Sequence, residues 1–199
     1  AGDDGLYWMP VDGSRKPELL VHHPGFVVPT SWNSRTGDLA YYDHRKFEIW
    51  IRSPDNKTHM FRGGAGRQRS GRFSPDGKWM AFVSDEINGD YQVYVTAYLG
   101  PGPTTTVSTT GGLSPIWSAK GDELYFRLGG KVMVSRMTSQ TPTFSTPKEL
   151  FDGPYTLDLM GHQREAVAKD GRFLMVENSD DFPIIVVQNW AKELARLVK

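Results

Sequence analysis

Polar stretches of the chain hold most of the side chains that could do chemistry. Four of the five histidines lie in such stretches, close in sequence to carboxylates and arginines. A cluster of histidine and carboxylate side chains can bind a metal ion or polarise a substrate, and imidazole titrates near neutral pH. The residues that could form a ligand-binding site are His22, His23, Asp43, His44, Arg69, Asp85, His162 and Arg164. The alternative interpretation is that polar loops collect these residues because they are solvated.

The known catalytic and metal-binding motifs are incomplete in this chain. Asp85–Asp90 offers oxygen ligands and a glycine but lacks the twelve-residue spacing and distal glutamate of a calcium loop. Ser145–Lys148 matches Ser-x-x-Lys, yet Pro147 favours a turn leading into a strand, whereas this motif opens a helix in serine acyl-enzymes. The glycine-rich Gly63–Arg67 lacks the context of a phosphate loop, and no Gly-x-Ser-x-Gly elbow occurs. We therefore expect neither a metal nor a cofactor, and the pattern assigns no catalytic residue.

One pattern occurs four times along the chain and determines the expected fold. Each copy has an aromatic or apolar strand end, a Ser-Pro-Asp-Gly-like turn and a second apolar strand. The turn glycines are 40, 44 and 50 residues apart, which is the period of a four-stranded propeller blade. They are Gly37, Gly77, Gly121 and Gly171.

The repeat predicts an all-β fold, namely a β-propeller of four-stranded antiparallel blades with about four blades per chain and incomplete terminal blades. In the best-preserved blade, strands are expected at Trp79–Ser84, Tyr91–Tyr98 and Thr104–Ser108 after the turn. The aromatic residues that recur in the repeats are expected in the core; they are Trp32, Phe73, Trp79, Trp117, Tyr125 and Phe126. In a propeller, the loops before each first strand and between the second and third strands converge at the channel mouth. All eight candidate site residues fall in those loops.

The repeat residues also carry a family resemblance. Phe73–Phe82, the preceding Arg69–Arg72, and Tyr7–Gly13 resemble the WD40-like propeller repeats of TolB-type proteins. Asn189–Leu197 resembles the carboxyl end of such propellers in bacterial sensor modules, including those attached to membrane-anchored kinases. The resemblance implies a periplasmic or extracellular location, without excluding the cytoplasm. It is specific for the fold and weak for the activity, because members of this superfamily serve as docking platforms, enzyme-associated domains and occasionally hydrolases.

Composition is consistent with one domain covering residues 1–199. The chain has 199 residues, 21 glycines and 13 prolines, which suits short strands and tight turns. Its formal net charge is zero, so no global field favours nucleic acid or an anionic membrane. The sequence contains no long apolar run that would predict membrane insertion. Zero cysteines exclude disulfides and permit an oxidising compartment.

Both ends of the chain are expected to form incomplete blades. Gly5–Val21 supplies two strands and Gly161–Trp190 supplies three, with residues 190–199 as a short helical tail. Such a chain could close alone, form part of a longer propeller, or close as a homodimer by exchange of terminal half-blades.

The functional hypothesis is a non-catalytic module, a sensor or scaffold that binds a protein, peptide or small-molecule ligand at the channel mouth. The alternative is an esterase-like or lactonase-like hydrolase that uses His and Asp residues at the same mouth.

Overall fold

A computed structural model describes residues 4–139, 142–158 and 162–177. The regular elements in these ranges are sixteen β-strands. They are β1 (Gly5–Trp8), β2 (Glu18–His22), β3 (Val27–Trp32), β4 (Leu39–Asp43), β5 (Glu48–Arg52), β6 (Thr58–Arg62), β7 (Gln68–Phe73), β8 (Trp79–Ser84), β9 (Gln92–Ala97), β10 (Thr105–Thr106), β11 (Leu113–Trp117), β12 (Glu123–Leu128), β13 (Lys131–Arg136), β14 (Lys148–Phe151), β15 (Glu165–Val167) and β16 (Phe173–Met175).

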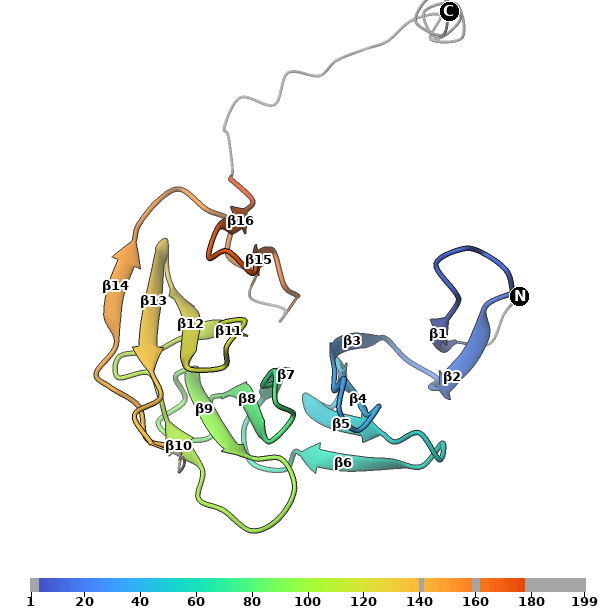
Figure 1. Ribbon diagram of the computed structural model, residues 1–199. Helices are drawn as coiled ribbons and strands as arrows, with labels where there is room; N and C mark the ends of the chain where they lie inside the picture. The colour runs from blue at the N-terminus through green and yellow to red at the C-terminus, as the bar shows by residue number, and fades with distance from the viewer. Residues whose placement is uncertain (1–3, 140–141, 159–161, 178–199) are drawn as a thin grey trace, which may run out of the picture.

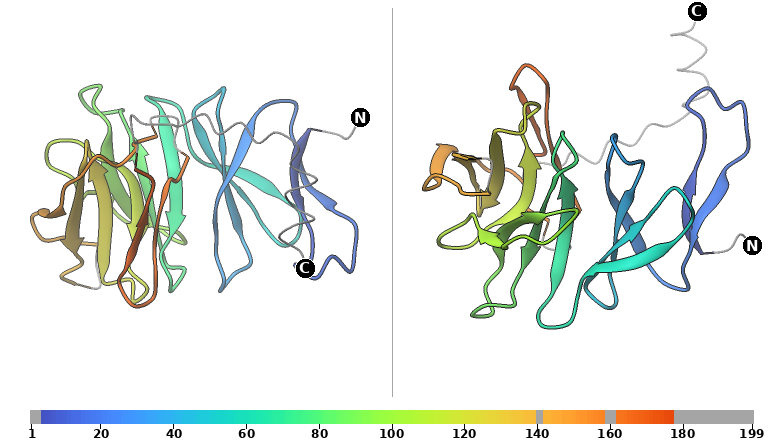
Figure 2. Two further views of the ribbon diagram at one scale, coloured as in Figure 1. Left: turned by 90° about the horizontal axis from the view of Figure 1, so that it is seen from above. Right: turned by 60° about the horizontal axis from the view of Figure 1, so that its bottom comes forward.

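The strands form five antiparallel sheets arranged around a common centre (Figure 1). Three sheets have four strands each, in the orders β3-β4-β5-β6, β10-β9-β8-β7 and β11-β12-β13-β14, and β1-β2 and β15-β16 are two-stranded. The first strands β3, β7, β11 and β15 lie nearest the centre, whereas β6, β10 and β14 form the outer rim (Figure 1). Viewed from the side, the sheets stand next to one another like blades (Figure 2). The all-β propeller prediction with incomplete terminal blades is confirmed.

The repeated turn joins the first two strands of each blade as expected. Its four glycines, Gly37, Gly77, Gly121 and Gly171, all have φ between 69° and 87°, a region that side chains with a Cβ rarely enter. The Gly77 turn also contacts the preceding blade, because the Asn33 side-chain amide donates to the Gly77 carbonyl oxygen at 3.2 Å. The repeat therefore determines the hairpin inside a blade, and its turn also takes part in a hydrogen bond between two blades.

Apolar side chains fill the spaces between blades. The largest cluster contains Val83, Val93, Val95, Trp117 and Phe126, all buried and drawn from two adjacent four-stranded sheets. The indole N–H of Trp117 donates to the carbonyl oxygen of Arg72 in the neighbouring blade, 3.2 Å away. Burying one such side chain contributes about 1.5–3 kcal/mol, so each blade depends on its neighbour for stability.

One of the aromatic core predictions is wrong. Trp32 occupies the same turn-flanking position as Phe73 and Trp117, which are both 7% exposed, yet Trp32 is 53% exposed. Trp117 packs on the inner strand β7 of the preceding blade, whereas the sheet that precedes Trp32 contains only β1 and β2. Trp32 is exposed because no described inner strand lies where its neighbour would pack. Trp79 and Tyr125 are only partly buried.

The described ring is open between the β1-β2 sheet and the β15-β16 sheet (Figure 1). The first two strands of the last repeat are β15 and β16. The third strand expected for this repeat and the helical tail expected at 190–199 lie outside the described residues. Among the residues that are described, no helix is long and apolar enough to cross a membrane.

Candidate ligand-binding site at the channel mouth

Loops from neighbouring blades meet at one edge of the ring. Residues 23–26 precede β3, residues 44–47 connect β4 to β5, and residues 63–67 precede β7. The His44 N–H donates to the Phe26 carbonyl at 3.2 Å, and the Gln68 N–H donates to the Phe47 carbonyl at 3.0 Å. The convergence expected from propeller topology is thus present in the first blades.

Aromatic rings gather at this mouth. The ring of His44 lies edge-on to Phe26 and Tyr42, with centroids 5.7 and 5.8 Å away, and 6.1 Å from Phe47. Phe47 has a φ of 58°, a left-handed conformation that is rare for a bulky residue. Two backbone hydrogen bonds fix it there: its N–H donates to Asp43 at 2.9 Å and its carbonyl accepts from Gln68. Such strain is concentrated at functional sites in proteins, so Phe47 belongs with the candidate residues.

Two guanidinium groups contact these rings. The guanidinium carbon of Arg69 lies 4.6 Å from the Tyr91 ring centroid and 5.4 Å from that of Phe47, and the Arg67 group lies 5.2 Å from Phe47. The pairing of β7 with β8 is interrupted between Arg69 and Arg72, and Ser70 there has a φ of 54°. A bulge of this kind re-aims side chains, and here the Arg69 group faces the rings of the mouth.

The site contains buried polar atoms without a partner. The Tyr42 hydroxyl, His44 Nδ1 and Arg69 Nε each lack a hydrogen-bond partner among the residues that the structure describes. Burial raises the pKa of Tyr42 to about 12, so its hydroxyl stays protonated and can donate at neutral pH. Buried polar groups are nearly always satisfied in native proteins. These unsatisfied groups, gathered in one aromatic cluster, are therefore the feature of this mouth that points to a ligand.

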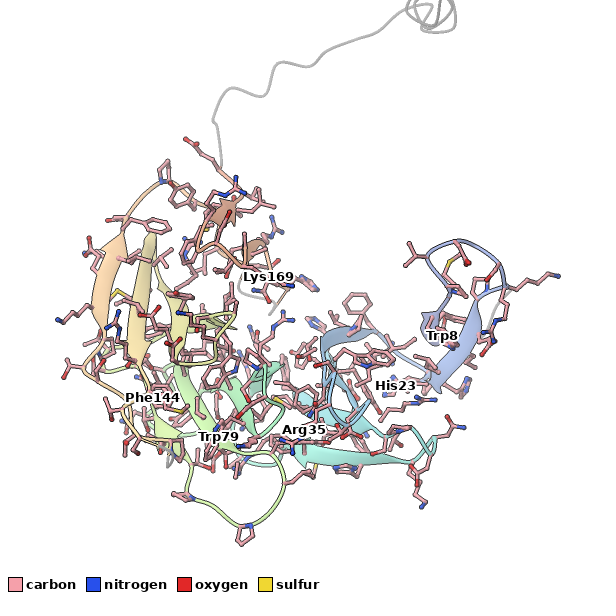
Figure 3. The ribbon with its side chains drawn as sticks, viewed as in Figure 1. Trp8, His23, Arg35, Trp79, Phe144 and Lys169 are labelled. Carbon is pink, nitrogen blue, oxygen red and sulfur yellow. The ribbon has the colours of Figure 1, made fainter. Side chains whose placement is uncertain are left out.

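His23 and Asp43 form a pair that holds two loops together. His23 Nε2 lies 3.1 Å from Asp43 Oδ2, while Asp43 Oδ1 accepts the backbone N–H groups of Arg45 and Lys46 at 2.9 and 3.2 Å. Figure 3 shows His23 where the two-stranded sheet meets the β3–β6 sheet. Asp43 is buried and its oxygens are engaged, so this pair positions the mouth loops.

The last repeat reaches the same mouth through His162. Its ring centroid lies 6.1 Å from that of Phe26, an edge-on contact between segments far apart in sequence. The buried Asp158 holds this segment, because its Oδ2 lies 3.1 Å from His162 Nδ1 and 3.0 Å from Arg164 Nε. His44 and His162 therefore both contact the exposed ring of Phe26.

The remaining two candidates lie at the margin. His22 ends β2 and is exposed, lining with His23, Tyr41 and Trp50 a groove of about 400 Å³ between β2 and the next sheet. Asp85 Oδ1 accepts the backbone N–H of Arg67 at 2.5 Å and so fixes the loop before β7. The structure brings His44, Arg69 and His162 to the aromatic cluster, while Arg164 shares Asp158 with His162, and His22 lies apart.

Sequence reasoning missed the aromatic members and one carboxylate of this site. Phe26, Tyr42, Phe47 and Tyr91 form its ring contacts, and Asp158 orients His162. A usable signal was present for two of them, since Phe26 and Phe47 are large aromatic residues outside the strand positions that the repeat assigns to the core. In the described ranges, no three His, Cys, Asp or Glu residues gather in a group that could hold a metal ion.

A second polar cluster lies between the β11–β14 sheet and the β15-β16 sheet. Arg127 is 2% exposed and its Nη2 donates to the carbonyl oxygens of Gly129 and Tyr155, both at 3.1 Å. Glu165 on β15 is also buried, and burial raises the pKa of its carboxyl group, although the Ser114 hydroxyl and the Arg127 charge act to lower it.

Replacing Glu165 with glutamine is expected to stabilise the protein more at pH 7 than at pH 4, relative to the wild type. The unfolded glutamate ionises near pH 4.5, whereas the folded one keeps its proton to a higher pH, so wild-type stability falls as pH rises between the two pKa values. The neutral glutamine lacks this dependence. Urea unfolding at both pH values measures the difference. If the variant instead became less stable relative to the wild type between pH 4 and pH 7, the attraction of the Glu165 carboxylate to Arg127 would outweigh the cost of burying its charge.

Comparisons with known proteins agree on the fold. No family model matches the chain, and no curated protein matches it significantly. Solved structures do match. TolB from Acinetobacter baumannii has a TM-score of 0.61 and 18% identity, and the match covers 85% of this chain and 42% of that protein; for a TolB-type protein from Agrobacterium tumefaciens the values are 0.58 and 21%, with coverage of 76% of this chain and 57% of that protein. A gluconolactonase from Xanthomonas campestris has a TM-score of 0.60 and 13% identity, and the match covers 81% of this chain and 59% of that protein.

These likenesses concern architecture. The chain spans less than two thirds of the length of each of these three proteins, and the identities lie in the range where the fold is shared without a shared activity. The repeat, the four-stranded blades and the structural matches lead to one statement about the fold. In fold, the chain is a TolB-like β-propeller of the WD40-like type.

Proposed function

We propose that this chain is a non-catalytic binding module that takes a protein, peptide or small-molecule ligand at the channel mouth. The observation that carries the proposal is the set of three buried, unpartnered polar atoms on Tyr42, His44 and Arg69 within one aromatic cluster. Binding sites typically combine apolar walls with a few convergent polar groups. The partly exposed rings of Phe26 and Phe47 supply the walls, and the loops bring them together from separate strands.

The arrangement of the carboxylates supports binding over hydrolysis. The His23–Asp43 and His162–Asp158 pairs each resemble a base with its orienting carboxylate. In the described part of the chain, neither histidine has a hydrogen bond to a hydroxyl that could act as a nucleophile. A hydrolase needs that contact together with oxyanion donors. The likeness to a gluconolactonase fold keeps a lactonase-like or esterase-like activity as the second candidate, with His162 and Asp158 as its base and orienting group.

Ligand-observed NMR with a fragment library tests the proposal. We expect fragments that bind the wild type to lose at least about tenfold in affinity in the His44→Ala/His162→Ala variant, because both rings border the same Phe26 surface. His59→Ala is the matched control, since this histidine lies exposed on β6. Hits that persist in the double variant, or that weaken equally in the control, would place the binding site elsewhere.

Hydrolysis is measured on the same proteins with D-glucono-1,5-lactone and p-nitrophenyl acetate. The binding proposal predicts no turnover above the uncatalysed rate. Turnover that disappears in Asp158→Asn, with fragment binding retained, would instead establish the hydrolase. We also propose a periplasmic or extracellular location, which the TolB-like fold supports.

A further inference from the structure

Arg69 is a buried cation without a described counter-ion. The residue is 5% exposed, and its guanidinium group lies over the rings of Tyr91 and Phe47. None of the ion pairs among the described residues includes Arg69. Contact with aromatic rings offsets only part of the cost of burying a charge. A buried guanidinium in this setting is therefore suited to receive an anion.

The neighbouring carboxylates are engaged elsewhere. Both oxygens of Asp43 are used, one by the Arg45 and Lys46 N–H groups and the other by His23. Asp85 uses Oδ1 for the backbone N–H of Arg67. No ion pair of the described residues joins either carboxylate to Arg69, so the positive charge of Arg69 has no described counter-ion.

Two further features favour an oxyanion. Arg67 adds a second guanidinium on the same Phe47 ring, so two positive charges flank one aromatic surface. The unpartnered Nε of Arg69 belongs to the planar fork that binds carboxylate or phosphate oxygens in pairs. The Tyr42 hydroxyl, also unpartnered and protonated at neutral pH, is a further donor in the cluster.

We propose that Arg69, assisted by Arg67, binds an oxyanion, the carboxylate or phosphate group of the ligand at the channel mouth. Phe47 acts as a positioning residue, because its strained backbone holds the ring against both guanidinium groups. This inference rests on the proposed binding function and names the chemical class of its ligand.

The test observes the arginine Nε–Hε signals of the ¹⁵N-labelled full chain while sodium phosphate or sodium acetate is added at constant ionic strength. We expect the Arg69 signal, assigned by its loss in Arg69→Lys, to shift and saturate with at least one of the two anions. The anion that saturates at the lower concentration distinguishes a phosphate site from a carboxylate site. Arg35, from a different surface of the ring, serves as the reference signal.

Two variants separate recognition from general charge. In Arg69→Lys, followed by the Phe47 and Gln68 amide signals, the charge stays but the fork is lost, and anion affinity should fall about tenfold. Arg67→Gln changes an exposed residue, so it keeps the fold, and it should weaken binding about threefold. Arg35→Lys should leave the affinity unchanged.

Three results would overturn the inference. The first is that the Arg69 signal does not shift with either anion, as when a carboxylate of the chain itself already fills the site. The second is a shift that never saturates and equals that of Arg35, and the third is unchanged anion affinity in both Arg69→Lys and Arg67→Gln. Fragment binding that still depends on His44 and His162 would then leave the proposed function standing, so the two failures are distinguishable.

Discussion

Replacing Trp117 with alanine is expected to lower the free energy of unfolding by about 3–5 kcal/mol, the usual cost of removing a large buried aromatic side chain. Trp117 is 7% exposed, packs in the cluster between two blades and donates its indole N–H to the Arg72 carbonyl. The substitution therefore creates a cavity and also removes the hydrogen bond to the Arg72 carbonyl oxygen. Urea unfolding followed by circular dichroism measures the loss.

Trp32→Ala is the matched control, because Trp32 occupies the same repeat position but is 53% exposed. Its substitution should change the free energy of unfolding by no more than about 0.5 kcal/mol, as is usual for surface positions. If the two variants lost equal stability, Trp32 would be buried in solution by a strand or a second chain. A loss below about 1 kcal/mol for Trp117→Ala would instead contradict the interblade packing.

The fold was predictable because the repeat encodes it locally. The turn at Ser74–Gly77 specifies its own hairpin through proline, a capping aspartate and a glycine with positive φ, and its spacing to Gly121 sets the length of a blade. The solvent exposure of Trp32 was not predictable from the same pattern. Its burial depends on which strand the preceding sheet presents to it, and that is a property of the neighbouring blade.

The candidate site was predictable only in its outline. Propeller topology brings together the segments that hold His44, Arg69 and His162, and the structure places all three beside the aromatic cluster, with Arg69 in strand β7 where the sequence predicted a loop. Which side chains turn inward depends on local backbone geometry, such as the positive φ of Phe47 and the bulge at Ser70. Sequence patterns for strands and turns carry no signal for these two features.

Deleting residues 1–21 is expected to lower the melting temperature by about 10–20 °C or to abolish the cooperative transition, since 1 kcal/mol corresponds to roughly 2–4 °C in a chain of this size. Leu6 and Val21 pack with Leu39 and Tyr41 in a cluster in which all four are buried. Each such side chain contributes about 1.5–3 kcal/mol, and the four together rival the 5–15 kcal/mol that stabilises a typical domain.

Point variants separate loss of this cluster from loss of chain length. Leu6→Ala/Val21→Ala keeps every residue and should reproduce about half of the decrease, because Leu39 and Tyr41 then lose their partners without being fully exposed to water. Val11→Ala lies in the exposed connection between β1 and β2 and should leave the melting temperature unchanged. A truncated chain that kept its solubility and a melting temperature within about 3 °C of the full chain would show that the half-blade contributes little. We do not expect that result, because the deletion exposes Leu39 and Tyr41 to water together, and exposing two large apolar side chains costs free energy.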